Sequence, residues 1–107
     1  MKWTGDSEEL TIHLAGEIDH YAAEKLRREI ESLIKANRPQ TLVLNFQEVS
    51  FMDSSGIGML IGRYKTMLAQ GGKVYACCLS SSVSRLYRMA GLHRIIPLVS
   101  ADGRKEA

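Results

Sequence analysis

The chain has 107 residues, a length that suits one compact domain and is too short for two. Hydrophobic residues make up 45% of the chain, which provides enough material for a core and argues against global disorder. The net charge is +2, from 14 basic and 12 acidic residues, and this near-balance gives no support for direct nucleic-acid binding, which needs a concentrated basic face.

The first expected elements are two strands. Residues 10–15 alternate strictly, as a strand with one covered face does, and residues 2–4 can pair with them across residues 5–8. The N-terminus has no apolar signal core, and no apolar run reaches transmembrane length, so we expect no membrane association.

A helical pattern follows from about Tyr21 to Ala36, and Asn37, Arg38 and Pro39 end it. Its apolar positions share one face: Ala22, Leu26, Ile30, Leu33 and Ile34. Residues 41–46 form a mostly continuous apolar run, which is typical of a strand buried on both faces.

The next helix is expected from about Ser55 to Gln70, with Gly71 and Gly72 ending it. Its predicted buried face contains five side chains: Ile57, Leu60, Ile61, Tyr64 and Leu68. Three glycines, Gly56, Gly58 and Gly62, fall on other arcs, and an interior glycine costs about 1 kcal/mol relative to alanine. Either the helix backbone packs closely against a neighbour, or its bare surface is approached from outside.

Residues 73–79 form a second buried strand, which contains Cys77 and Cys78. A disulfide between adjacent cysteines is badly strained, and the chain has no metal-type cysteine spacing, so we expect two reduced thiols, no metal site and a cytoplasmic protein.

The last predicted helix begins at a cap, Ser81 or Ser82, and ends near Gly91. Its shared face contains Val83, Leu86, Tyr87 and Ala90. Residues 94–99 complete the pattern as a strand, which Pro97 places at a sheet edge. The order of elements predicts an α/β domain, with a mixed, mostly parallel sheet and crossover helices.

The segment Asp53-Ser54-Ser55 stands between a strand and a helix. It lacks the Gly-x-Ser-x-Gly of a nucleophile elbow, and the glycines that follow fit neither a dinucleotide fingerprint nor a phosphate-binding loop. A serine at this position either caps the helix or accepts a phosphoryl group, because the free N–H groups of a helix N-terminus favour an anion.

Three separated motifs resemble one family. Residues 53–58 resemble the phosphorylation motif of anti-sigma factor antagonists, which belong to the STAS-domain family. The longer stretch 51–65 is most similar to the members that act in sporulation. Residues 16–20 resemble the family's Gly-Glu-Leu-Asp-His element, and residues 90–92 its Ser-Gly-Leu element. The resemblance therefore implies a single STAS domain over residues 1–107.

The resemblance implies partner switching in transcription regulation and no enzymatic activity. The unphosphorylated protein would bind an anti-sigma factor that is also a serine kinase, and would thereby release the sigma factor. The kinase would phosphorylate the second serine of the motif, Ser55, with its own ATP and Mg²⁺, and a serine phosphatase would reset the phosphoprotein. The chain itself would need no cofactor.

The residues expected to form the switch and partner surface surround Ser55: Asp19, His20, Asp53, Ser54, Gly56, Gly58, Met59, Gly62 and Arg63. Asp19 is also a candidate cap of the first helix, and the two roles are compatible. Arg63 is expected on a polar helix face as a partner contact. Met59 is either a packing residue or, beside two glycines, an exposed one.

Three alternatives remain open: a STAS regulator of the general stress response, a small hydrolase that uses Ser54 or Ser55, and a STAS domain from a larger transporter or signalling assembly. Family members usually end with a further helix, whereas the tail from about residue 100 is short and polar. That last helix is therefore expected to be absent or vestigial.

Overall fold

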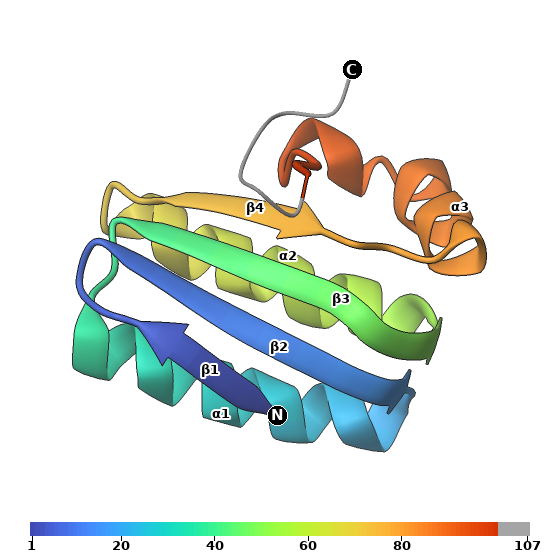
Figure 1. Ribbon diagram of the computed structural model, residues 1–107, viewed down its shortest axis with the longest axis horizontal. Helices are drawn as coiled ribbons and strands as arrows, with labels where there is room; N and C mark the ends of the chain where they lie inside the picture. Colours follow the sequence, from blue (N-terminus) through green and yellow to red (C-terminus); the bar gives the residue numbers. More distant parts are fainter. Residues whose placement is uncertain (101–107) are drawn as a thin grey trace.

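A computed structural model describes residues 1–100 and contains one sheet of four strands (Figure 1). In spatial order these are β1 (Lys2–Gly5), β2 (Glu9–Ile18), β3 (Thr41–Met52) and β4 (Lys73–Cys77). β1 pairs with β2 antiparallel, and the β2–β3 and β3–β4 pairs are parallel. The predicted mixed, mostly parallel sheet is confirmed.

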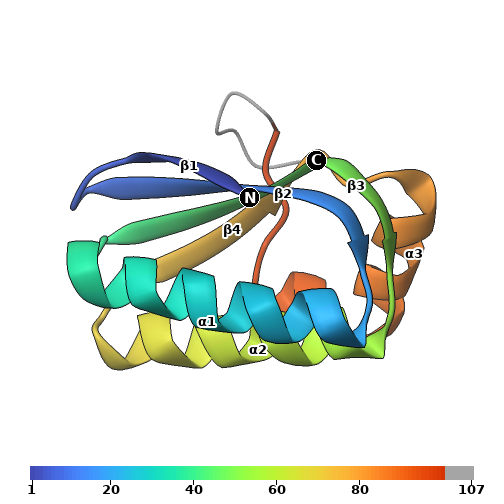
Figure 2. The ribbon, with the colours of Figure 1, turned by 90° about the horizontal axis from the view of Figure 1, so that it is seen from below.

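Three helices connect and follow these strands: α1 (His20–Asn37), α2 (Ser54–Ala69) and α3 (Ser81–Met89). Figure 2 shows α1 and α2 side by side on one face of the sheet, whereas α3 lies at the end of the sheet. α1 and α2 are the crossovers of the two parallel strand pairs, as the sequence pattern predicts.

The core lies between the α1–α2 layer and the sheet. α1 buries Ala23, Leu26, Ile30 and Ile34 in it. β3 contributes the fully buried Leu42, Leu44 and Phe46, while the alternate residues of the strand are only half-buried. The prediction that this strand is buried on both faces is therefore wrong, because α1 and α2 cover a single face of the sheet.

The expected final strand over residues 94–99 is also wrong. Its start belongs instead to a short 3₁₀ helix, η1 (Leu92–Arg94), and a single parallel bridge joins Leu98 to Ala76. The side chain of Tyr87 anchors this segment, since its hydroxyl donates a 2.6 Å hydrogen bond to the Ile96 carbonyl. The chain thus reaches the edge of β4 with one bridge in place of a ladder.

Two local predictions beside α3 need correction. The hydroxyl that caps α3 belongs to Ser80, which accepts from the N–H of Val83, and not to Ser81 or Ser82. Cys77 is buried at the end of β4, but Cys78 lies beyond the strand, half-buried, in the left-handed conformation with φ of 66°. Gly91 does follow α3 in the left-handed conformation that ends helices.

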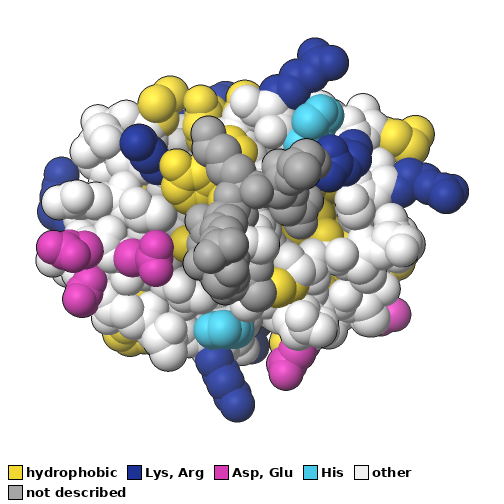
Figure 3. Space-filling model, turned by 45° about the horizontal axis from the view of Figure 1, so that its top comes forward, with side chains coloured by type: hydrophobic (Ala, Val, Ile, Leu, Met, Phe, Trp, Pro, Cys, Tyr) yellow, Lys and Arg dark blue, Asp and Glu magenta, His cyan; other side chains and the backbone are white. Residues whose placement is uncertain are grey.

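The surface in Figure 3 shows both basic and acidic side chains on the visible part of one face. This mixture agrees with the near-balance of charge in the sequence. The polar tail predicted from about residue 100, and with it the expected absence of a last helix, lies almost entirely outside the described residues.

α2 buries a different arc from the one that the apolar pattern predicts. Met67 is fully buried, whereas Leu68, which was expected in the core, is 58% exposed. The reason is that α2 packs against α1 as well as against β4 and β3, so its buried arc is turned toward α1. Neighbouring positions on a helix are about 100° apart, so turning the buried arc toward α1 buries Met67 and exposes Leu68.

This exchange can be tested by truncating each side chain in turn. We expect Met67→Ala to lower the free energy of unfolding by about 2–5 kcal/mol, because it leaves a cavity in the core. Leu68→Ala, the matched control on the exposed side, should change it by less than about 0.5 kcal/mol. Urea unfolding followed by circular dichroism measures both, and equal losses would contradict the described packing.

Candidate functional site

The site is built where two parallel strands end at the same level. Ile18, the last residue of β2, is the register partner of Met52, the last residue of β3. The backbone N–H of Asp53 donates to the Ile18 carbonyl at 3.3 Å, which continues the ladder by one bond. Asp19 and Asp53 therefore lie at the same edge of the sheet, each at the entrance of a helix.

Both aspartates cap the helices that follow them. The Asp19 carboxylate accepts from the N–H of Ala22 at 2.9 Å, and the Asp53 carboxylate accepts from the N–H of Ser55 at 2.9 Å. The cap predicted for Asp19 is confirmed. The proposed caps at Ser54 and Ser55 are wrong, because Asp53 takes that role.

The two serines consequently have hydroxyls that the fold does not use. Within residues 1–100 neither hydroxyl makes a hydrogen bond. Ser54 is exposed, and Ser55 is half-buried in the first turn of α2. The Ser55 hydroxyl therefore lies unused at the positive end of a 16-residue helix, where free N–H groups favour an anion.

Ser55 lines a groove of about 330 Å³ between α1 and α2, which we call the α1–α2 groove. α1 contributes one stripe of side chains, and α2 contributes another. The lining residues are His20, Ala23, Glu24, Arg27, Ser55, Gly58, Met59, Gly62 and Arg63. The structure thus brings together Ser55, His20 and four further residues that the sequence predicts for the switch surface.

The three glycines of α2 divide into two groups. A Cβ added at Gly56 would lie 2.8 Å from the Met52 sulfur and 3.1 Å from Ile18 Cγ2, so this glycine permits close packing on the sheet. A Cβ added at Gly58 or Gly62 would meet nothing within 4 Å. The close-packing explanation is therefore confirmed at Gly56, which is buried, whereas approach from outside at Gly58 and Gly62 stays a prediction that the open space permits.

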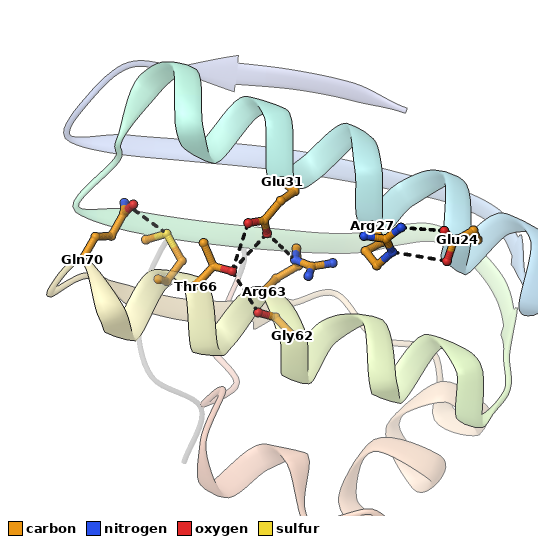
Figure 4. Close-up of polar contacts among 8 residues, drawn as sticks. Glu24, Arg27, Glu31, Gly62, Arg63, Thr66 and Gln70 are labelled. Atoms are coloured by element: carbon orange, nitrogen blue, oxygen red, sulfur yellow. Dashed lines mark hydrogen bonds and ion pairs between the residues drawn. The ribbon is translucent and has the colours of Figure 1, made fainter.

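Arg63 differs most from its predicted role. It was expected on a solvated face, yet only 7% of it is exposed. Its Nε lies 2.8 Å from a carboxylate oxygen of Glu31 on α1, and the same carboxylate accepts from the Thr66 hydroxyl at 3.0 Å (Figure 4). Arg63 is therefore an interhelical contact at the inner wall of the groove.

The environment of Arg63 is unusual for an arginine. Burial lowers its pKa, and the nearby charge of Arg27 lowers it further, while Glu31 opposes both effects. The guanidinium stays charged at neutral pH, since arginine ordinarily titrates above pH 12. Of the two roles left open for Met59, the packing role is confirmed, because the residue is 5% exposed and packs in the core.

Two exposed aromatic residues near the site escaped the sequence analysis. Tyr21 is 83% exposed and stacks edge-on against His20, with 5.7 Å between ring centroids. Phe51 is 46% exposed near the end of β3. Apart from His20, the α1 half of the groove was missed as well. Ala23, Glu24 and Arg27 follow helical spacing from His20, but that pattern identifies a face of the helix and not the element that it faces.

Two kinds of site find no support in the described part of the chain. Among residues 1–100 there is no cluster of histidine, cysteine or acidic side chains that could hold a metal ion. No helix within the same range is long and apolar enough to cross a membrane.

A small α/β domain with a serine at a helix entrance, beside a groove between two crossover helices, defines a recognisable class. The family model for the STAS domain matches residues 3–102. The chain therefore belongs to the STAS-domain family.

Among the relatives, the chain is 36% identical over 89 residues to an anti-sigma F factor antagonist of Paenibacillus polymyxa, covering 83% of this chain and 76% of the relative. It is 34% identical over 93 residues to an anti-sigma-B factor antagonist of Bacillus subtilis, and the match covers 87% of this chain and 84% of the relative.

Solved structures of similar proteins include SpoIIAA, an anti-sigma factor antagonist, in its unphosphorylated form. That structure matches with a TM-score of 0.82 and 30% identity, over 94% of this chain and 89% of SpoIIAA. SpoIIAA of Bacillus in the phosphorylated form matches with a TM-score of 0.72 and 29% identity, over 94% of this chain and 92% of SpoIIAA.

The division of the glycines predicts opposite effects of alanine. Gly56→Ala should destabilise the protein, by about 1–3 kcal/mol before the gain in helix propensity, because Met52 and Ile18 must move. Gly58→Ala should stabilise it by up to about 1 kcal/mol, since the methyl group enters open space and improves the helix. Thermal melting compares the two variants, and a destabilised Gly58→Ala would show that the groove is needed by the fold itself.

Proposed function

We propose that this chain is an anti-sigma factor antagonist that acts as a phosphorylation-controlled binding module. Its unphosphorylated form would bind an anti-sigma factor that is also a serine kinase, and so free a sigma factor. The observation that carries the proposal is the free hydroxyl of Ser55 at the entrance of α2, beside an open groove. Its similarity to an anti-sigma F factor antagonist and to SpoIIAA supports the assignment as an anti-sigma factor antagonist.

Phosphorylation of Ser55 would switch this binding off. The partner kinase would bring ATP and Mg²⁺; the serine oxygen forms a bond to the γ-phosphorus, the bond to the bridging oxygen breaks, and ADP and a proton are released. The N-terminus of α2 can accept the added charge, so the fold should persist. A serine phosphatase would restore the binding form.

The expected docking surface surrounds the groove. Gly58 leaves the helix backbone accessible, and Asp19 and His20 form the exposed rim at the start of α1. Tyr21 adds a large exposed aromatic side chain of the kind that dominates many interfaces. Ser54 is exposed beside these residues and belongs to the same proposed surface.

Two regulatory pathways are candidates for the proposed antagonist. Relatives named for sigma F and for sigma B both match at similar identity, so the proposal of a sporulation regulator and that of a general stress-response regulator rest equally on these relatives. A serine hydrolase is the weaker alternative. His20 lines the groove with Ser55, but within residues 1–100 no carboxylate accepts a hydrogen bond from it, as a catalytic triad would require.

The site of modification can be mapped directly. We expect the kinase that co-purifies with the chain from its native cell to label Ser55 and not Ser54 when ATP is added. The reasons are the resemblance of the motif and the position of Ser55 beside the groove. Mass spectrometry of peptides from the wild type, Ser55→Ala and Ser54→Ala identifies the residue. Labelling that persists in Ser55→Ala and disappears in Ser54→Ala would overturn the assignment.

A second experiment measures the switch. Ser55→Ala should keep its fold and its affinity for the kinase, because Asp53 and not the serine hydroxyl caps α2. Phosphorylated Ser55 should lower the affinity at least about a hundredfold, since an added interfacial charge costs several kcal/mol. Ser55→Asp should weaken binding less, because its charge is smaller. Calorimetry with circular dichroism of each form tests this, and unchanged affinity of the phosphoprotein would refute the switch.

A further inference from the structure

Two guanidinium groups meet in the α1–α2 groove. Arg63 and Arg27 both line it, and Figure 4 shows the Arg63 side chain extending between the helices toward Arg27. Each has a carboxylate at its side: Arg63 has Glu31, and Arg27 makes two bonds to Glu24, at 2.6 and 3.2 Å. The positive charge of Arg27 lowers the pKa of Arg63, because the two guanidinium groups lie close to each other.

The hydrogen-bonding capacity of Arg63 is incompletely used. Nη1 is buried and has no hydrogen-bond partner among the described residues, and Nε, although 2.8 Å from Glu31, is not aligned for a hydrogen bond. A buried charged donor without an acceptor is costly. An anionic oxygen group in the groove would supply that acceptor and would separate the two like charges.

We propose that the α1–α2 groove binds the phosphoryl group carried by Ser55, with Arg63 and Arg27 as its cationic partners. The inference rests on the proposed function, because it needs a modified Ser55, and it names what holds the group once it is attached. Ser55 lines the groove that Arg63 closes, so the anion is tethered at the mouth of its own site. A tether of this kind gives a high effective concentration.

The spacing of Ser55 and Arg63 along α2 bears on whether a phosphoryl group on the serine can approach the arginine. Ser55 and Arg63 are eight residues apart, which is about 12 Å along the helix axis. The arginine side chain leans back toward the helix N-terminus, as long side chains on helices do, and this brings its guanidinium closer to the level of Ser55. Gly62 has no side chain, so position 62 places nothing in the groove beyond its backbone.

Capture of the phosphoryl group changes the account of switching. The phosphate would fill the hollow that Gly58 and Gly62 leave open, and would engage the arginines at its inner wall. A partner that inserts a group into the groove would then find it occupied. Aspartate at position 55 has a shorter reach and a smaller charge than phosphoserine, so it should imitate phosphate only in part.

Several charged groups surround this position, and a titration must account for all of them. α1 contributes His20, Glu24, Arg27 and Glu31, the α2 side contributes Asp53 and Arg63, and Asp19 lies at the rim. The acidic groups raise the second pKa of a phosphate, while the arginines lower it. Removing one arginine at a time isolates the contribution that the proposal assigns to it.

The test uses the whole chain with phosphoserine encoded genetically at position 55, so that no kinase or partner is needed. Phosphorus NMR follows the second ionisation of the phosphate, which in a free monoester occurs near pH 6. All proteins carry His20→Gln, because histidines titrate in the same pH range. Arg63→Met should raise the phosphate pKa by about 0.5 unit or more, and Arg27→Met should raise it less, since removal of an opposite charge disfavours the dianion.

Matched controls keep the result specific. Arg85→Met removes an exposed arginine of α3 that does not line the groove, and should leave the pKa unchanged. Arg63→Lys should restore part of the shift, because it keeps the charge without the guanidinium geometry. Should Arg63→Met fail to fold by circular dichroism, Arg27→Met, on an exposed side chain, decides the question. If folded Arg63→Met and Arg27→Met titrate as Arg85→Met does, the groove does not hold the phosphate, whatever the kinase assay gives.

Discussion

The parallel pairing of β2 with β3 is the constraint on which the site depends. β3 uses 12 residues where β2 uses 10, and two register shifts absorb the difference, so that Ile18 and Met52 finish side by side. Because both strands end at one level, Asp19 and Asp53 lie at the same edge of the sheet and cap the starts of α1 and α2. The two helices then run side by side on one face of the sheet, and a groove forms between their N-terminal halves.

The ion pair between Arg63 and Glu31 adds a second constraint within the helical layer. It places a charge at the inner wall of a groove whose other walls are partly apolar. A buried ion pair seldom stabilises a fold better than well-packed apolar residues would. Thr66 satisfies part of the Glu31 carboxylate, but Nη1 of Arg63 stays unsatisfied in the described part of the chain. Stability alone therefore does not account for this arginine, and its position favours a role toward a ligand.

The sequence predicts the elements well because their signals are local. Strict alternation identifies β2, Pro39 follows the end of α1, and Asp19 caps the start of that helix as expected. The errors arise where tertiary packing decides. Arg63 has the chemistry of a surface residue, and only the closeness of α1 to α2 buries it. Apolar character likewise predicts a strand over residues 94–99, but the anchoring hydrogen bond of Tyr87 and the turn of η1 replace the ladder.

The glycines of α2 connect the stability of the fold with its function. Gly56 is explained from within, because Met52 and Ile18 occupy the space of a side chain. Gly58 and Gly62 have no such neighbour, yet each weakens the helix by about 1 kcal/mol relative to alanine. Among residues 1–100, no neighbour occupies the space that a side chain at either position would take. A helix that begins with a free serine hydroxyl and stays bare along the same groove is better suited to admit a group from outside the core than to stabilise itself. The weakness of α2 and the openness of the groove thus have one physical cause.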